Sequence, residues 1–150
     1  MIGTYILEKR IMEAINIWSG SAYSIGAVLT NPTELAYRKG NLKNHYPVKF
    51  KDIIYPDAEA AYQANKVNEI SQDMPIMTSI IVAKLRQYPR ITESISQAGG
   101  AEWLKSCSYH VTGESWWEGC GENSKFICCL VRAYEIIQLI LDYEKLETTF

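Results

Sequence analysis

The last part of this 150-residue chain is predicted to form one long amphipathic helix. Asn123 or Ser124 is a suitable N-cap, and the helix is expected to continue to about Lys145. Its apolar residues recur mostly at intervals of three and four positions, and they are Phe126, Ile127, Leu130, Tyr134, Ile137 and Leu141. We expect this stripe to be the inner face of the helix.

Shorter helices are predicted in the middle of the chain. The expected ranges are 56–68, 74–88 and 91–98. The first has Asp57 and Glu59 near the positive end of the helix dipole. Pro89 stops the second helix because proline cannot continue it, and Gly99 with Gly100 closes the third.

Few strands are expected. Residues 47–54 alternate apolar and polar side chains, which is typical of a half-buried strand, and residues 16–19 are expected to form another. Thr33 or Asn31 is expected to cap a short helix, and residues 105–121 form the longest irregular segment. These elements predict a single helix-rich α+β domain over the whole chain, with a small, mostly antiparallel sheet.

Charge and cysteine content restrict the class of protein. With 15 basic and 17 acidic residues, the chain lacks the excess of positive charge that general polyanion binding requires. No apolar run reaches the roughly 18 residues of a membrane span, and Glu8, Lys9 and Arg10 argue against a secretory segment. Adjacent Cys128 and Cys129 cannot easily bridge each other, and four cysteines are too few for a disulfide scaffold. We therefore expect a cytoplasmic protein without membrane association.

Neither a metal nor a cofactor is expected. Cys107, His110 and Cys120 are the nearest approach to a zinc-binding set. They contain no paired C-x-x-C motif, and no fourth ligand is evident.

One face of the helix predicted over residues 56–68 carries the most promising chemistry. At 100° per residue, Glu59, Gln63 and Lys66 fall within about 60° of one another, and Tyr62 flanks them. A carboxylate, an amide and an ammonium beside an aromatic ring suit a sugar-phosphate site. The alternative is a solvated helix face with a Glu–Lys pair, which needs no ligand.

A second candidate segment precedes the long helix. Trp117 can stack on a base, and Gly119 and Gly121 allow backbone amides to approach an anion or a ribose oxygen. The alternative is a loop that covers the core with its tryptophans. Glu118 and Glu122 count against simple anion binding because their carboxylates would repel a nearby phosphate.

Several motifs together resemble one known family. They are residues 55–66 (YPDAEAAYQANK), 17–21 (IWSGS), Met77 with 83–85 (AKL), 117–121 (WEGCG) with Asn123, and 130–132 (LVR). In this order they are similar to the signature of the NADAR family, the NAD- and ADP-ribose-associated domain, also called YbiA-like. The resemblance covers about residues 16–135 and implies a YbiA-like fold.

The resemblance implies an enzyme that cleaves N-glycosidic bonds at ribose C1. One branch of the family removes ADP-ribose from guanine bases in nucleic acid, and another hydrolyses phosphoribosylated intermediates of the riboflavin pathway. It implies that Glu59 is the essential glutamate and Lys66 the motif lysine, both catalytic. Together with the two candidate segments, it gives as substrate-binding residues Ser19, Gly20, Tyr55, Tyr62, Gln63, Lys84, Trp117, Gly119, Gly121 and Asn123.

The family analogy leaves two mechanisms open. Glu59 would stabilise an oxocarbenium-like transition state or activate water, while Lys66 would hold a phosphate or attack C1 to form an imine. The stretch between Lys66 and Met77 is shorter than in the riboflavin-type members, so we favour an ADP-ribosyl or NAD-related substrate. The riboflavin-type activity and a non-catalytic ADP-ribose-binding module remain alternatives.

Overall fold

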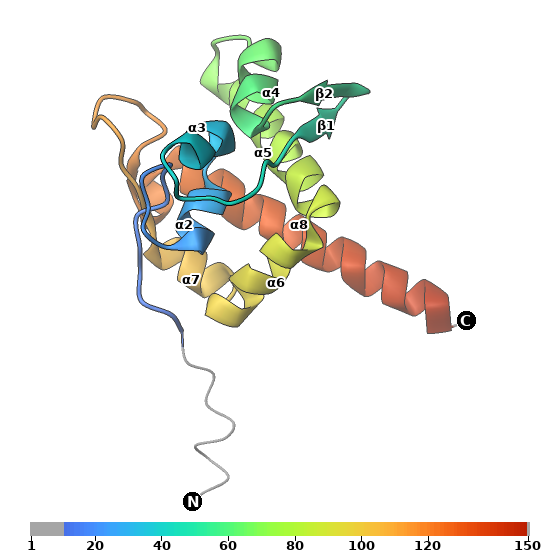
Figure 1. The fold of residues 1–150 in the computed structure, drawn as a ribbon. Helices are drawn as coiled ribbons and strands as arrows, with labels where there is room; N and C mark the ends of the chain where they lie inside the picture. The colour runs from blue at the N-terminus through green and yellow to red at the C-terminus, as the bar shows by residue number, and fades with distance from the viewer. Residues whose placement is uncertain (1–10, 150) are drawn as a thin grey trace, which may run out of the picture.

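A computed structural model describes residues 11–149 and shows the helix-rich α+β fold that the sequence predicted (Figure 1). The helices are α2 (Ser24–Leu29), α3 (Thr33–Arg38), α4 (Ala58–Asn65), α5 (Ile70–Gln87), α6 (Pro89–Ala98), α7 (Ala101–Ser106) and α8 (Lys125–Thr149). The strands β1 (Val48–Phe50) and β2 (Ile53–Tyr55) form one antiparallel pair, and β3 (Ser108–Tyr109) and β4 (Gly119–Cys120) form another. Residues 1–10, which include the charges that argue against a secretory segment, lie outside the described residues.

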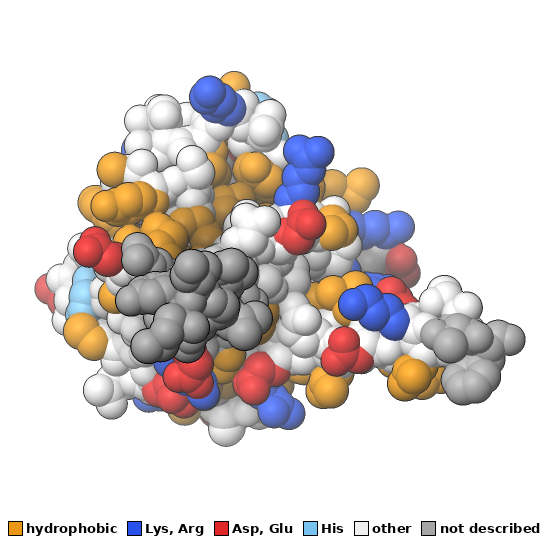
Figure 2. All heavy atoms as spheres, turned by 90° about the horizontal axis from the view of Figure 1, so that it is seen from below, with side chains coloured by type: hydrophobic (Ala, Val, Ile, Leu, Met, Phe, Trp, Pro, Cys, Tyr) orange, Lys and Arg blue, Asp and Glu red, His pale blue; other side chains and the backbone are white. Residues whose placement is uncertain are grey.

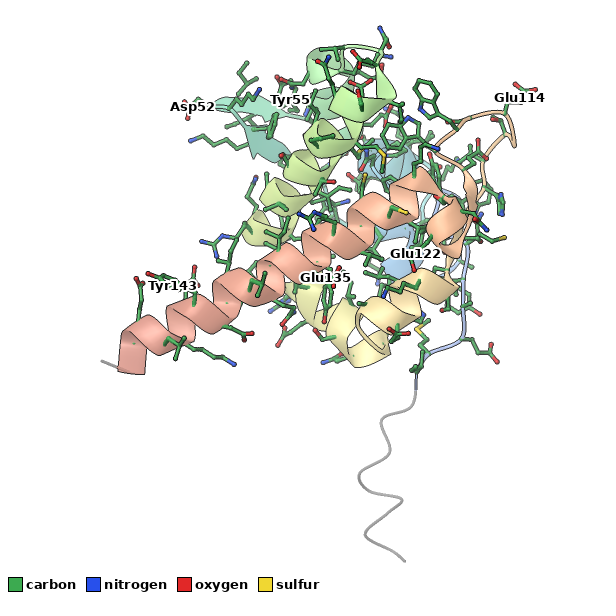
Figure 3. All side chains as sticks on the ribbon, turned by 180° about the vertical axis from the view of Figure 1, so that it is seen from behind. Asp52, Tyr55, Glu114, Glu122, Glu135 and Tyr143 are labelled. Atoms are coloured by element: carbon green, nitrogen blue, oxygen red, sulfur yellow. The ribbon has the colours of Figure 1, made fainter. Side chains whose placement is uncertain are left out.

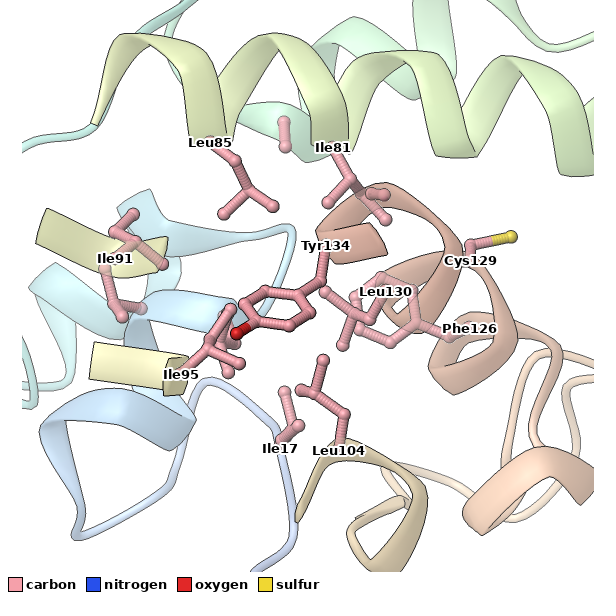
Figure 4. Packing of buried hydrophobic residues seen from close by; sticks show 14 of the residues in the cluster. Ile17, Ile81, Leu85, Ile91, Ile95, Leu104, Phe126, Cys129, Leu130 and Tyr134 are labelled. Atoms are coloured by element: carbon pink, nitrogen blue, oxygen red, sulfur yellow. The ribbon is translucent and has the colours of Figure 1, made fainter. Parts of the chain in front are cut away.

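Helices α5 and α8 form the centre of the domain, and their buried side chains meet between them (Figures 1 and 4). Ile81 and Leu85 of α5 face Leu130 and Tyr134 of α8, and all four are buried. Removing one such aliphatic side chain from water stabilises a fold by about 1.5–3 kcal/mol. The shorter helices α6 and α7 complete this core from the other side, with Ile95 among the residues that they bury.

The predicted stripe of α8 is buried except at its last position. Ser124 caps the helix, because its hydroxyl accepts a hydrogen bond from the backbone N–H of Ile127 at 3.1 Å. Leu141, however, is 38% exposed, so its assignment to the inner face was wrong. The helix projects past the elements that cover its first half, and Figure 2 shows hydrophobic side chains on this projecting end. Leu139 and Leu146 of α8 are both exposed.

Residues 47–54 form a β-hairpin rather than the single strand predicted from their alternation. Lys51 and Asp52 both have positive φ angles, 51° and 66°, so the chain turns there and Val48 pairs with Tyr55. Two consecutive left-handed residues match the right-handed twist of the flanking strands. The alternating pattern did not reveal the turn because it contains no glycine or asparagine.

The strand predicted at residues 16–19 is also wrong. Asn16 makes only an isolated parallel bridge to Ser108, and the chain turns directly afterwards at Ser19 and Gly20. The irregular segment predicted over residues 105–121 is shorter than expected. Helix α7 reaches Ser106, and β3 and β4 then pair to hold the two ends of the remaining loop together.

Several helix boundaries differ from the predictions. Helix α4 is confined to Ala58–Asn65 because Asp57 occupies its N-cap, which leaves Pro56 before the helix. Helix α5 begins at Ile70 and contains Pro75 in its second turn, where proline removes one intrahelical hydrogen bond. Helices α6 and α8 match the predicted elements closely, although α6 starts with Pro89 itself and α8 continues to Thr149.

None of the helices among residues 11–149 is both long and apolar enough to cross a membrane. The most apolar long helices, α5 and α8, bury their apolar faces against each other instead.

Candidate functional site

The helical face predicted from the sequence borders a cavity of about 480 Å³. Among the residues that line it are Glu59, Tyr62, Gln63, Lys66 and Trp117, which the sequence analysis had selected. The first four come from α4 and its C-terminal end, and Trp117 comes from the loop before β4. The structure thus brings the two candidate segments, about 50 residues apart in sequence, to one site.

Asp57 fixes the start of α4 and thereby the position of Glu59. One carboxylate oxygen of Asp57 accepts a hydrogen bond from the Ala60 N–H at 2.9 Å, and the other accepts from the Glu34 N–H at 3.1 Å. Asp57 therefore caps α3 as well as α4, and the expected caps Thr33 and Asn31 do not serve this purpose. The neighbouring N–H of Glu59 donates to the backbone oxygen of Asn31 at 3.2 Å. These bonds hold the first turns of both helices together.

The polar side chains of α4 differ in their hydrogen bonding. The Gln63 Nε2 group donates to Glu59 Oε1 at 2.7 Å and orients this half-buried carboxylate. Glu59 lies in the first turn of the helix, where the helix dipole favours a negative charge. Lys66 ends the helix, and its Nζ makes no hydrogen bond or ion pair with any residue in the described range 11–149. The cavity is therefore bordered by an oriented carboxylate and an unpaired ammonium.

Tyr62 and Trp117 form an aromatic wall. Their ring centroids are 5.6 Å apart in an edge-to-face arrangement, with an interplanar angle of 85°. The Tyr62 hydroxyl donates to Asp73, whose fully buried carboxylate also accepts from the Val67 N–H at 2.8 Å. Burial, followed by the charge of Asp73, raises the pKa of Tyr62 to about 12. Tyr62 thus stays neutral and links the wall to the segment that follows Lys66.

Tyr109 also lines the cavity, although the sequence analysis did not select it for this role. Its ring packs against Phe126 with a centroid separation of 4.7 Å. Burial, followed by the charges of Glu59 and Glu118, raises the pKa of Tyr109 to about 12. The phenol therefore keeps its proton near Glu59. No local pattern predicted this role, because the residue lies in a two-residue strand within a segment expected to be irregular.

The loop that carries Trp117 is organised around Glu118. Partial burial alone would raise the pKa of this carboxyl, but hydrogen bonds from the N–H groups of Val111, Gly113 and Thr112 outweigh it and lower the pKa to about 2. The Thr112 hydroxyl also donates to it, at 3.1 Å. Glu118 is not among the residues that line the cavity. The negative charge of Glu118 therefore orders the loop. Repulsion between Glu118 and a phosphate in the cavity is accordingly weaker than the sequence alone suggested.

The same loop places further residues at the mouth of the cavity. Glu114 lies at its tip, as Figure 3 shows, and the neighbouring Trp116 is 51% exposed. Trp117 itself is half-buried and packs against the core. The loop therefore combines the two roles that the sequence left open, because it covers the core and also borders the cavity.

Lys84 does not reach the cavity, contrary to the role implied by the resemblance. It is 2% exposed, and its Nζ donates to the backbone oxygens of Val28 at 2.5 Å and Thr30 at 2.8 Å. Burial lowers the pKa of Lys84 to about 7, although the charge of Asp57 opposes the shift. Lys84 therefore supports the segment between α2 and α3 rather than a ligand.

Three further residues assigned to substrate binding lie away from the cavity lining and have other contacts. The Ser19 hydroxyl accepts a hydrogen bond from Lys39 Nζ at 2.7 Å. Gly20 lies against the ring of Trp18, which leaves no room for a Cβ atom. The Tyr55 hydroxyl accepts from Asn65 Nδ2 at 3.4 Å, and Figure 3 places Tyr55 on the hairpin, well away from the loop tip.

Gly119, Gly121 and Asn123 are likewise absent from the cavity lining. Gly121 has a φ of 55°, and a Cβ atom there would lie 2.6 Å from the backbone oxygen of Lys105. Gly119, with a φ of 156°, approaches the backbone of Asn123 closely. Both glycines are thus explained by backbone geometry.

The cysteine and histidine residues weighed as a zinc-binding set lie at and below the surface near β3 and β4. His110 Nε2 lies 3.3 Å from the Cys120 sulfur, whereas Cys107 is fully buried. Within residues 11–149, no group of three or more His, Cys, Asp or Glu side chains is arranged to hold a metal ion.

Comparisons with protein-family models, with curated proteins and with solved structures found no match to this chain.

Proposed function

We propose that this protein is an N-glycosyl hydrolase that cleaves the bond between ribose C1 and a base or amine in an ADP-ribosyl or NAD-related substrate, such as ADP-ribosylated guanine. The observation that carries the proposal is the joint placement of Glu59 and Lys66 on one cavity walled by aromatic rings. The resemblance of residues 55–66 to the NADAR signature points to the same chemistry.

In the proposed reaction, water adds to C1 as the bond from C1 to the nitrogen of the leaving group breaks. Glu59 stabilises the positive charge that develops on the sugar or removes a proton from the attacking water. The leaving nitrogen takes up the proton that the attacking water loses, so the reaction yields the free base or amine and the 1-hydroxyl sugar. Gln63 keeps the Glu59 carboxylate oriented.

The remaining lining residues fit an aromatic, phosphate-bearing substrate. Trp116 and Trp117 offer faces or edges against which a base can pack. Lys66 is the cation available for a phosphate, whereas Glu59 and Glu114 would repel one. We therefore expect the phosphates to lie at the Lys66 end of the cavity and the reacting C1 atom to lie near Glu59.

The test is a mass-spectrometric turnover screen of the wild-type protein and Glu59→Gln. The substrates are an ADP-ribosylated guanine oligonucleotide, NAD, ADP-ribose and the phosphoribosylamines of the riboflavin pathway. We expect the wild type to release free base from an ADP-ribosyl or NAD-related substrate and Glu59→Gln to be inactive. Glu102→Gln is the matched control, because Glu102 also lies in the first turn of a helix but is not among the residues that line the cavity.

The other possible outcomes would change either the assigned function or the assigned mechanism. Release from the phosphoribosylamines alone would assign the riboflavin-type activity. Binding of ADP-ribose without any turnover would indicate a non-catalytic module, and wild-type activity in Glu59→Gln would remove Glu59 from the mechanism. Borohydride trapping of a sugar adduct that Lys66→Ala loses would establish attack by Lys66 on C1.

A further inference from the structure

A second cavity, of about 800 Å³, shares no lining residue with the cavity beside Glu59. Three segments border it, namely helix α2, the connection between α3 and β1, and the turn from α5 into α6. Apolar side chains form part of its lining, and they are Ile25, Val28, Leu42 and Ile91. Its volume falls in the range of about 300–1,000 Å³ that is typical of small-molecule sites.

Two tyrosines add an aromatic part to this lining. The ring centroids of Tyr46 and Tyr88 are 5.1 Å apart, and the ring planes meet at 73°. The Tyr88 hydroxyl donates to the backbone oxygen of Pro47 at 2.6 Å, which ties the pair to the segment before β1. Both tyrosines are half-buried, so they remain partly accessible from the cavity. A planar ring of a ligand can pack against aromatic side chains held in this way.

The charged side chains of this lining are basic. Arg90 and His45 both line the cavity, whereas no Asp or Glu does so among the described residues. His45 Nδ1 already lies 2.7 Å from a carboxylate oxygen of Glu34. The Arg90 guanidinium, in contrast, makes no hydrogen bond or ion pair with any residue of the range 11–149. The lining therefore includes one unpaired cation.

Arg90 also occupies an unfavourable position in its helix. It is the second residue of α6, near the positive end of the helix dipole, where a negative charge would be stabilised and a positive charge is not. The first turn of α6 contains no acidic residue, and Glu93, one turn further on, forms no ion pair with Arg90. An anion bound in the cavity beside Arg90 would pair with the guanidinium and would also interact favourably with the dipole.

We infer that this second cavity binds a small aromatic anion, with its ring against Tyr46 and Tyr88 and its carboxylate or phosphate group at Arg90. A purely apolar ligand would leave the guanidinium without a partner, and a bare inorganic anion would leave the apolar lining in contact with water. Both an aromatic body and an anionic group are therefore needed to match this lining. The site is distinct from the proposed catalytic cavity and does not depend on the proposed function.

The test is an NMR titration of the ¹⁵N-labelled protein with three probes, phenyl phosphate, benzoate and neutral phenol. We expect both anions to shift the backbone amide signals of Tyr46, Arg90 and Ile91. At least one anion should bind about tenfold more tightly than phenol, as expected for one hydrogen bond to a charged group. The anion with the higher affinity identifies the preferred anionic group.

Arg90→Gln removes the guanidinium and should weaken the binding of that anion about tenfold, while the affinity for phenol stays unchanged. The substitution is not expected to disturb the fold, because Arg90 is exposed and unpaired. Arg132→Gln is the matched control. It removes the same charge from an exposed position on α8 that does not line this cavity, so it should keep the wild-type affinities.

Three results would overturn the inference. Equal affinity of the wild type for phenol and for both anions, or an unchanged affinity in Arg90→Gln, would remove Arg90 as the partner of the anion. Shifts confined to residues around Glu59, such as Lys66 and Trp117, would place the probes in the other cavity. No shift with any probe up to about 10 mM would show that the second cavity binds no such ligand. Turnover at Glu59 is measured separately by the mass-spectrometric screen, so it is unaffected by these outcomes.

Discussion

Asp57 joins two helix N-termini, because its Oδ2 atom accepts the backbone N–H of Glu34 at 3.1 Å while its Oδ1 atom caps α4. A single buried carboxylate thus holds α3 against the helix that carries Glu59. Glu34 and Asp57 are 23 positions apart in the sequence. Their hydrogen bond therefore helps to fix where the helix that carries Glu59 lies relative to α3.

Asp57→Ala is expected to lower the free energy of unfolding by about 2–3 kcal/mol, because each lost cap costs roughly 0.5–2 kcal/mol. Urea denaturation followed by circular dichroism gives this value directly. Asp142→Ala is the control, since Asp142 is exposed on α8 and should change stability by less than about 0.5 kcal/mol. Equal effects of the two substitutions would show that Asp57 does not join the helices.

The lowered pKa of Lys84 predicts that the free energy of unfolding depends on pH. Its pKa is about 7 in the folded protein and 10.5 ordinarily, so between these values the unfolded chain binds a proton that the folded protein has released. The free energy of unfolding therefore rises with pH from about 7 to 10. Lys84→Met should remove this rise, although it also leaves the oxygens of Val28 and Thr30 unpaired.

The measurement for Lys84 is the free energy of unfolding of wild type and variant at several pH values. The difference between the two proteins isolates the contribution of this group from other titrating residues. Lys105→Met serves as the control because the side chain of Lys105 is partly exposed and pairs with the exposed Glu102 at 3.7 Å. A wild-type rise that persists in Lys84→Met would mean that another group causes it.

The sequence predicted the parts of the fold that depend on local periodicity. The apolar spacing of α8 and the Gly99–Gly100 stop of α6 are properties of neighbouring residues, and both were confirmed. The hairpin at Lys51 and Asp52 was missed because its turn uses residues that do not favour positive φ. Leu141 was misassigned because periodicity gives the face of a helix but not where its covering elements end.

The candidate site could likewise be predicted only where its residues share one local pattern. Glu59, Tyr62, Gln63 and Lys66 share one helical face, so their joint placement followed from spacing alone. Asn31 and Tyr109 reach the cavity from distant segments, and no pattern in their own neighbourhood indicates it. Burial of Lys84 was likewise invisible in the sequence, because its partners are backbone oxygens 54 and 56 positions away.

The different environments of Leu130 and Leu141 predict unequal effects of truncation. Leu130 is 1% exposed and Leu141 is 38% exposed, although both occupy the same predicted stripe. Leu130→Ala should cost about 2–5 kcal/mol through lost burial and a residual cavity, whereas Leu141→Ala should cost less than about 1 kcal/mol. Chemical denaturation of the two variants tests this difference. Similar losses would indicate that the projecting end of α8 is covered in solution.

Glu118 predicts an unusual acid titration in the loop that borders the cavity. Its folded pKa of about 2 lies below the ordinary value of 4.5, so its stabilising effect is complete above about pH 4.5 and is lost as the pH falls through about 2. In a ¹⁵N-labelled sample, the backbone amide signals of Val111, Thr112 and Gly113 should therefore move with a midpoint near 2.

Glu118→Gln should abolish that titration and increase the mobility of the loop, because an amide oxygen binds the three N–H groups more weakly than a carboxylate does. Glu122→Gln provides the control, since Glu122 is exposed and its side chain accepts none of these hydrogen bonds. Because the loop also places Trp117 at the cavity, Glu118→Gln should weaken ADP-ribose binding while Glu122→Gln leaves it unchanged. A midpoint near 4.5 in the wild type would show that Glu118 does not order this loop.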